Sequence, residues 1–204
     1  DPAVADKFNC KLPWITSINV DYFVGVDGLS IAMVLLVSIL TPLTILGAHQ
    51  WAGLNQPGRA GPKPFFALLL LEQTGLYGTF TALNFFHWFI FWEVSLVPMF
   101  FLIKLYGNEN RTRASYQFFV YTFVGSVMML IGMQFVYLAT GSWALPALAG
   151  MAREASGQTG QSVLAVKIQD LAGKLGAPFL VKHSVSLIFF LVFAGFAVKV
   201  PLWP

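Results

Sequence analysis

The chain has 204 residues, of which 57% are hydrophobic and only 10% are charged. Soluble domains carry about 25% charged residues, so this chain cannot hide its apolar surface in one water-soluble globule of its size. It is therefore expected to lie partly in lipid. The net charge of +3 includes no basic run typical of nucleic-acid binding. The single cysteine, Cys10, excludes an intrachain disulfide. Together these features predict an all-α integral membrane protein, a polytopic bundle of transmembrane helices.

The N-terminal part predicts a polar segment followed by a helix. Residues 1–26 are mixed in character and are expected to form an extramembrane segment. A first transmembrane helix is predicted over 27–51, because its 20 central residues carry no charge and suffice for about 30 Å of helix. Asp27 is placed to cap this helix and Pro42 to kink it. Residues 52–64 are expected to form a loop.

The middle of the chain predicts three more spans. Transmembrane helices are expected over 65–83 and 85–106. Since only Asn84 separates them, these two helices must form a tight antiparallel hairpin. A charged loop is expected over 107–115, and a fourth transmembrane helix over 116–140.

The C-terminal part predicts a long connection and an incomplete helix. Residues 141–183 are expected to form an extramembrane loop, with an amphipathic helix over about 161–175 lying at an interface. The apolar residues that define this helix recur every three or four positions: Leu164, Ile168, Leu171 and Leu175. The segment 184–204 is predicted to be the first half of a broken transmembrane helix. Because the chain stops inside that hydrophobic segment, it is expected to be a piece of a larger polypeptide.

Three ionisable residues fall inside predicted spans: Glu72, Glu93 and Lys199. A central charge costs about 2.5–3.5 kcal/mol on insertion scales, and such residues usually face a bundle interior or a water-filled cavity. Glu72 lies 12 residues before Asn84 and Glu93 nine residues after it, at depths of roughly 18 and 13 Å from the turn. The two carboxylates are therefore expected at nearly the same level on adjacent helices.

Glu93 has a structural and a functional interpretation. In the structural one it pairs with another helix and holds the bundle together, although buried ion pairs stabilise weakly. In the functional one it is a protonatable station, for which Lys199 is the candidate cation at depth. Pro98 favours the second interpretation, because it frees a carbonyl one turn from Glu93 and makes room for water. An ordinary kink is the alternative for Pro98.

Lys199 stands just before two prolines, Pro201 and Pro204, which cannot continue a regular helix. The helix is expected to break there, and broken helices near the midplane are typical of ion-handling sites in transporters. A buried lysine can lose its proton and regain it when an anion approaches, so Lys199 is a candidate carrier. Its alternative is to snorkel to an interface.

Two further residues are candidates for an additional proton path or for a structural role. Glu72 shares its helix with Gln73 and Tyr77, so a structural hydrogen-bond network is the alternative to a proton route. His87 lies about 120° around the helix from Glu93, and an interfacial residue is favoured over a relay partner. No metal-ligand spacing or soluble-type catalytic motif is present in the sequence.

Three stretches, VDGLSIAMVLLVSIL, FWEVSLVPMFFLI and FAGFAVKVPLWP, resemble the antiporter-like membrane subunits of respiratory complex I, most of all subunit M. The resemblance covers nearly the whole chain. It implies a fourteen-helix fold of two inverted five-helix repeats, each with a proline-broken helix. This chain would hold helices three to six and the first half of seven. Glu93 matches the family's glutamate on the fifth helix, and Lys199 matches the lysine on the broken seventh.

The resemblance implies a proton-translocating subunit of NADH:quinone oxidoreductase, in which a buried Glu–Lys relay is coupled to quinone reduction. The chain itself would bind no metal and no redox cofactor; NADH, FMN, iron–sulfur clusters and quinone would belong to partner subunits. Its partners would be other membrane-arm subunits, including sibling antiporter-like subunits, in a bacterial or mitochondrial inner membrane. A subunit of a multisubunit cation/proton antiporter is the alternative function. A purely structural membrane scaffold is the third, and the deep charges disfavour it.

Overall fold

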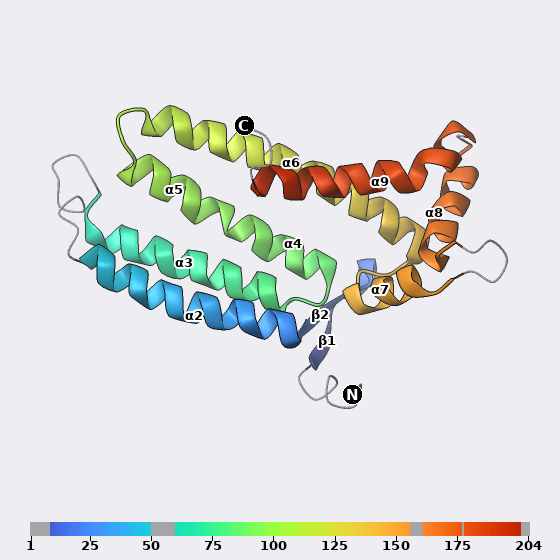
Figure 1. Cartoon of the computed structure of the whole chain (residues 1–204), viewed down its shortest axis with the longest axis horizontal. Helices are drawn as coiled ribbons and strands as arrows, with labels where there is room; N and C mark the ends of the chain where they lie inside the picture. The colour runs from blue at the N-terminus through green and yellow to red at the C-terminus, as the bar shows by residue number, and fades with distance from the viewer. Residues whose placement is uncertain (1–8, 50–59, 156–160, 177, 201–204) are drawn as a thin grey trace. The chain divides into compact units, whose positions relative to one another are not determined.

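The computed structural model describes residues 9–49, 60–155, 161–176 and 178–200 (Figure 1). Two strands, β1 (Asn9–Ile15) and β2 (Val20–Gly25), flank a short 3-10 turn, η2 (Thr16–Ile18), and form a two-stranded sheet. The helices follow in chain order: α2 (Gly28–His49), α3 (Pro62–Thr81), α4 (Phe85–Val94), α5 (Leu96–Tyr106), α6 (Arg111–Thr140), α7 (Leu145–Arg153), α8 (Val163–Lys174) and α9 (Pro178–Lys199).

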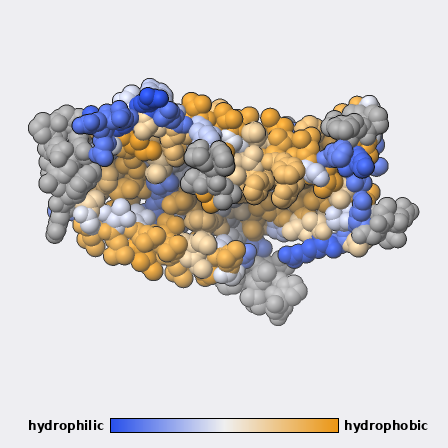
Figure 2. All heavy atoms as spheres, turned by 45° about the horizontal axis from the view of Figure 1, so that its top comes forward, coloured by the Kyte–Doolittle hydropathy of each residue, from blue (hydrophilic) through white to orange (hydrophobic). Residues whose placement is uncertain are grey.

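Four segments of the described chain are long and apolar enough to cross a membrane: Gly28–His49, Phe85–Tyr106, Arg111–Thr140 and Val181–Lys199. Figure 2 shows hydrophobic residues over the sides of the long helices and hydrophilic residues gathered near helix ends. The 20-residue helix α3 is not among the four, because polar residues such as Glu72 and Gln73 lower its hydropathy. Its membrane crossing stays a prediction. The mostly helical membrane architecture predicted from the sequence is confirmed.

The N-terminal hairpin is an addition to the helical fold, where the sequence predicted only a polar segment. Asn19 ends the 3-10 turn with a φ of 52°, a left-handed conformation that asparagine tolerates better than most residues. Its side-chain amide donates to the Gly141 carbonyl at 2.9 Å. The Ile18 carbonyl accepts from the Tyr137 hydroxyl at 3.0 Å and from the Trp143 indole at 3.2 Å. These long-range bonds, which no local pattern encodes, hold the turn against the end of α6.

The chain divides into two compact units. Unit 1 takes the described residues of 1–12, 22–82 and 86–120, and unit 2 takes those of 13–21, 83–85 and 121–204. Unit 1 therefore contains α2 to α5 and the start of α6. Unit 2 contains the rest of α6 and α7 to α9.

In unit 1, α2 and α3 lie side by side. The predicted cap of α2 is confirmed: the Asp27 carboxylate accepts from the backbone N–H groups of Leu29 at 3.1 Å and Ser30 at 2.7 Å. The Ser30 hydroxyl in turn accepts from the Asp27 N–H at 2.8 Å, which completes a reciprocal cap. These bonds lower the pKa of Asp27 below its usual 3.8, the hydrogen bonds with Ser30 contributing most.

In unit 2, α8 (Val163–Lys174) falls within the segment predicted as an amphipathic helix, and part of its apolar side packs inward. Ile168 is buried with Val136 of α6 and Leu148 of α7. Ser162 caps α8 by accepting from the Ala165 N–H at 3.2 Å. The helix α7 was not predicted. Its residue Leu148 packs against Ile168, one of the apolar residues of α8.

Glycines bring α6 and α9 close together in unit 2. A Cβ atom added at Gly125 would lie 2.8 Å from Val198, and one at Gly132 would lie 3.0 Å from Val192. Small residues allow such close backbone approach between membrane helices. The pairing fixes the helix that carries Lys199 against α6.

Candidate functional site

Glu93 lies near the end of α4 and shares one side of the α4–α5 segment with three later residues. Leu96, Phe100 and Lys104 follow it at intervals of three, four and four residues, which places them in one row along a helix. Leu96 is only 3% exposed. The row therefore faces protein at Leu96, while Glu93, Phe100 and Lys104 are half-buried.

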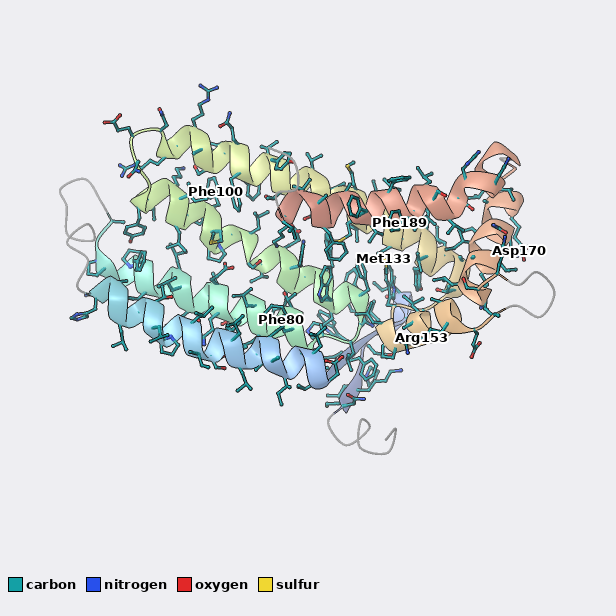
Figure 3. All side chains as sticks on the ribbon, viewed as in Figure 1. Phe80, Phe100, Met133, Arg153, Asp170 and Phe189 are labelled. Atoms are coloured by element: carbon teal, nitrogen blue, oxygen red, sulfur yellow. The ribbon has the colours of Figure 1, made fainter. Side chains whose placement is uncertain are left out.

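The start of α6 covers the far end of this row. The Phe100 ring centroid lies 5.5 Å from those of Tyr116 and Phe119 in edge-on packing, and Figure 3 shows Phe100 between α5 and α6. The Lys104 ammonium lies 5.5 Å from the Phe100 centroid and 5.2 Å from the Tyr116 centroid. At these distances the ring faces attract the cation. The Lys104 ammonium thus lies at the end of the row that begins with Glu93.

The Glu93 carboxyl group is buried without a hydrogen-bond partner at one of its oxygens. Glu93 Oε1 is shielded from solvent and accepts no hydrogen bond from any residue that the structure describes. Taking a carboxylate out of water without a partner costs several kcal/mol. This oxygen is therefore a place where a proton, a water molecule or a cation would be favourably bound.

Glu93, which the sequence predicted at the level of Glu72, is turned away from the helix that carries Glu72. A Cβ atom on Gly75 of α3 would lie 3.1 Å from that of Ser95, and one on Gly78 would meet the Phe91 ring. Phe91 and Ser95 therefore face α3. Glu93 lies two residues from Ser95, about 200° around the helix, and is turned away from α3. The structure therefore does not present Glu93 to the helix that carries Glu72.

Gln73 and Tyr77, which share α3 with Glu72, take part in a hydrogen-bond network. The Gln73 amide donates to the Tyr77 hydroxyl at 3.1 Å, and this hydroxyl lies 2.8 Å from the Ser38 hydroxyl of α2. Ser38 also donates to the Val34 carbonyl at 2.7 Å. The network joins α3 to α2, and a role for Glu72 in proton transfer stays a prediction.

Pro98 removes a helical hydrogen bond near Glu93, where the sequence analysis left open a freed carbonyl with room for water or an ordinary kink. It is fully buried as the third residue of α5, and its ring nitrogen cannot donate to the Val94 carbonyl. The helix is interrupted at Ser95, whose hydroxyl donates to the Trp92 carbonyl at 2.9 Å. The interruption follows Glu93 by two residues.

His87 is a packed core residue rather than an exposed interfacial one. It is 2% exposed. Its ring centroid lies 4.5 Å from that of Tyr22 on β2 and 5.0 Å from that of Phe91. The sequence could not predict this environment, because Tyr22 arrives from a hairpin 65 residues earlier in the chain.

Lys199 is the last residue of α9 and is half-buried. It belongs to unit 2, whereas Glu93 belongs to unit 1, so their pairing stays a prediction. Pro201 and Pro204, the predicted helix break, lie outside the described residues. Within the described ranges, no three His, Cys, Asp or Glu side chains cluster as a metal site would require.

Sequence reasoning missed Lys104 as a neighbour of the Glu93 row. Its signal was present, because Lys104 stands 11 residues after Glu93 and 11 residues are close to three full helical turns. What the sequence could not show is the pair of rings beneath the ammonium, one of them from α6.

Comparisons with known proteins agree on one family. Residues 82–204 match the family model described as NADH:quinone oxidoreductase/Mrp antiporter, TM. F(420)H(2) dehydrogenase subunit M of Methanosarcina mazei is 34% identical over 98% of this chain and 36% of its own length. NADH-quinone oxidoreductase subunit M of Rhodobacter capsulatus is 34% identical over 94% of this chain and 33% of its own length. The chain thus spans about a third of these relatives.

Solved structures show the same fold. Respiratory complex I from Thermus thermophilus contains a similar chain, with a TM-score of 0.62 and 23% identity over 93% of this chain and 41% of that one. The Mrp complex from Dietzia sp. contains another, with a TM-score of 0.61 and 18% identity over 85% of this chain and 18% of that one. With the family match covering more than half of its residues, the chain belongs to the NADH:quinone oxidoreductase/Mrp antiporter transmembrane family, as an antiporter-like subunit M homologue.

Proposed function

We propose that this chain is part of a proton-translocating membrane subunit of a respiratory quinone oxidoreductase, with Glu93 as a station that gains and loses a proton. The observation that carries the proposal is the buried Glu93 Oε1, which has no hydrogen-bond partner among the described residues. A carboxyl group in this state is stable when protonated and needs a cation or water when ionised. The helix interruption at Ser95 lies within one turn of it, and Pro98 leaves the Val94 carbonyl without its helical donor, so that water could bind there.

Lys199 is proposed as the second station of the relay. Its place at the end of a transmembrane helix favours a cation, because the helix dipole is negative there. A lysine in a partly buried site can release its proton and take it back. In the proposed cycle, Glu93 is ionised when Lys199 is charged, and Glu93 is protonated when Lys199 is neutral.

The redox chemistry is assigned to partner subunits of the membrane complex. NADH or another reduced cofactor, FMN, iron–sulfur clusters and quinone would bind there, and this chain would respond by moving protons. The similar chains from M. mazei and R. capsulatus carry the names of two different dehydrogenases. The electron donor would thus be set by the partners.

A cation/proton antiporter subunit is the second candidate, favoured by the similarity to a chain of an Mrp complex. The experiment that separates the two uses the full-length subunit, tagged and purified with its partners, in sealed liposomes. A respiratory subunit predicts co-purified redox subunits and internal acidification on addition of NADH or another reduced donor with quinone. Exchange of protons for Na⁺ or K⁺ without redox activity would contradict the proposal and support the antiporter.

A further inference from the structure

The apolar side of α8 is not fully covered by the rest of unit 2. Ile168 is 5% exposed, whereas Leu175, two turns further along, is 60% exposed. A cavity of about 50 Å³ lies beside them, between α6, α8 and α9. Phe135, Leu171 and Leu187 line it from the three helices. Part of the stripe that the sequence assigned to an interface is thus left uncovered by the described residues.

The cavity is built to receive hydrocarbon. Ser184 is the one polar residue among its described lining residues, and its hydroxyl already donates to the Val181 carbonyl at 3.1 Å. The walls therefore favour an apolar group over a polar one. Two of the three surrounding helices belong to candidate membrane spans. Leu187, which is 43% exposed, connects the cavity to the surface that faces lipid.

Two exposed lysines border this apolar side. Lys167 and Lys174 are seven residues apart and lie about 40–60° around α8 from Leu171. Their stems can run along apolar surface while the ammonium groups reach the headgroup region. Asp170, labelled in Figure 3, lies between them in sequence and offsets one charge. Lys174 also lines a hollow together with Asp170 of α8 and Val181 of α9.

We propose that α8, with α6 and α9, binds an anionic phospholipid. The end of one acyl chain occupies the cavity, and the phosphate binds Lys167 and Lys174 at the membrane surface. Burial of the methylene groups of the acyl chain supplies the part of the affinity that does not depend on the headgroup. The lysines supply the preference for a negative headgroup, which amounts to about 1 kcal/mol per basic residue near a membrane surface. With one charge offset by Asp170, the net preference corresponds to about fivefold.

The test uses the full-length subunit within its complex, placed in phosphatidylcholine bilayers that contain a little photoactivatable lipid. The reactive group sits at the end of an acyl chain, on phosphatidylglycerol in one sample and on phosphatidylcholine in the other. Crosslinks are located by mass spectrometry. We expect the peptides of α8 and early α9 to be labelled about five times more by phosphatidylglycerol. Leu187→Trp, which narrows the cavity from its open side, should reduce labelling by both lipids.

The headgroup preference is tested by a double change, Lys167→Gln with Lys174→Gln, which should bring labelling by the two lipids to equality. Lys63→Gln, at the start of α3 in unit 1, is the matched control and should leave the preference unchanged. Equal labelling by both lipids in the unaltered protein would overturn the proposal. So would labelling of α8 no stronger than that of α2, which would mean that protein rather than lipid covers this side of α8.

Discussion

Among the glycines at which α9 packs on α6, Gly195 leaves the least room for an added methyl group. In Gly195→Ala, the added Cβ would lie 2.6 Å from Met129 Cβ and 3.0 Å from the Gly125 carbonyl oxygen. Neither atom is the end of a flexible side chain, and Met129 is fully buried. The two helices must therefore separate if the methyl group is to fit.

The size of the effect follows from these distances. Carbon atoms pack best about 3.5–4.0 Å apart, so a 2.6 Å approach requires a retreat of about 1 Å. Overpacking of this kind typically costs about 1–3 kcal/mol of stability. Lys199 lies one turn beyond Gly195 on the same side of α9, so it would move with the helix. A displacement of about 1 Å at a reacting group can slow a reaction by about 100-fold.

The assay compares thermal stability and proton pumping of the assembled complex carrying Gly195→Ala or Gly47→Ala. Gly47 is the matched control, because it lies in α2 and a Cβ there meets nothing within 4 Å. In a helix, that change should stabilise by about 0.5–1 kcal/mol. We expect a lower Tm and slower pumping only in the first variant. If Gly195→Ala matched the unaltered complex in Tm and pumping, the close α6–α9 contact would be refuted.

Three more changes test separate parts of the structure. Asp27→Ala should cost about 1 kcal/mol of stability at neutral pH, and Asp27→Asn should cost less. Because the folded state lowers the pKa of Asp27, the stability advantage of the unaltered protein over Asp27→Asn should be present above about pH 4 and fade as the pH falls further. Unfolding measured as a function of pH tests this. Lys199→Arg keeps the charge but cannot release a proton, so pumping should fail in the assembled complex; normal pumping would make the lysine a fixed countercharge. Lys199→Ala should reduce the pumping rate about as much as Glu93→Gln, and the double change should reduce it little more than either alone. Additive losses of pumping would show two independent sites. Ile168→Asp places a charge in the core of unit 2 and should reduce the amount of assembled complex much more than Leu171→Asp, whose side chain borders an open cavity; equal yields on gel filtration would argue against the inward packing.

Hydropathy and local patterns predicted most of the helical fold, because a membrane helix is specified by the length of its apolar run. The same reasoning found the cap at Asp27 and the helix interruption at Pro98, each of which depends on residues within one turn. It assigned 1–26 only to a polar segment, because the β1–β2 hairpin depends on bonds to Gly141 and Trp143 far along the chain. Long-range contacts of this kind leave no local signal.

The candidate site was predictable in part for the same reason. Glu93 and Lys199 stood out because a charge inside an apolar run is costly wherever the helix lies. The side to which Glu93 points depends on which face of α4 meets α3, and this was fixed only by the contact of Gly75 with Ser95. His87 illustrates the converse, since a histidine near a helix end has no local mark that it will be buried against Tyr22.

Proton pumping by the assembled complex with Glu93→Gln tests the central claim most directly, because glutamine keeps the shape and hydrogen bonding of a neutral carboxyl group but cannot ionise. Glu109→Gln is the matched control, since Glu109 is exposed in the loop between α5 and α6. Internal acidification of liposomes is measured with a reduced donor and quinone, alongside the rate of quinone reduction. We predict that Glu93→Gln abolishes pumping and slows coupled quinone reduction while the complex still assembles, and that Glu109→Gln behaves as the unaltered complex does. Pumping at the unaltered rate in an assembled Glu93→Gln complex would contradict the account.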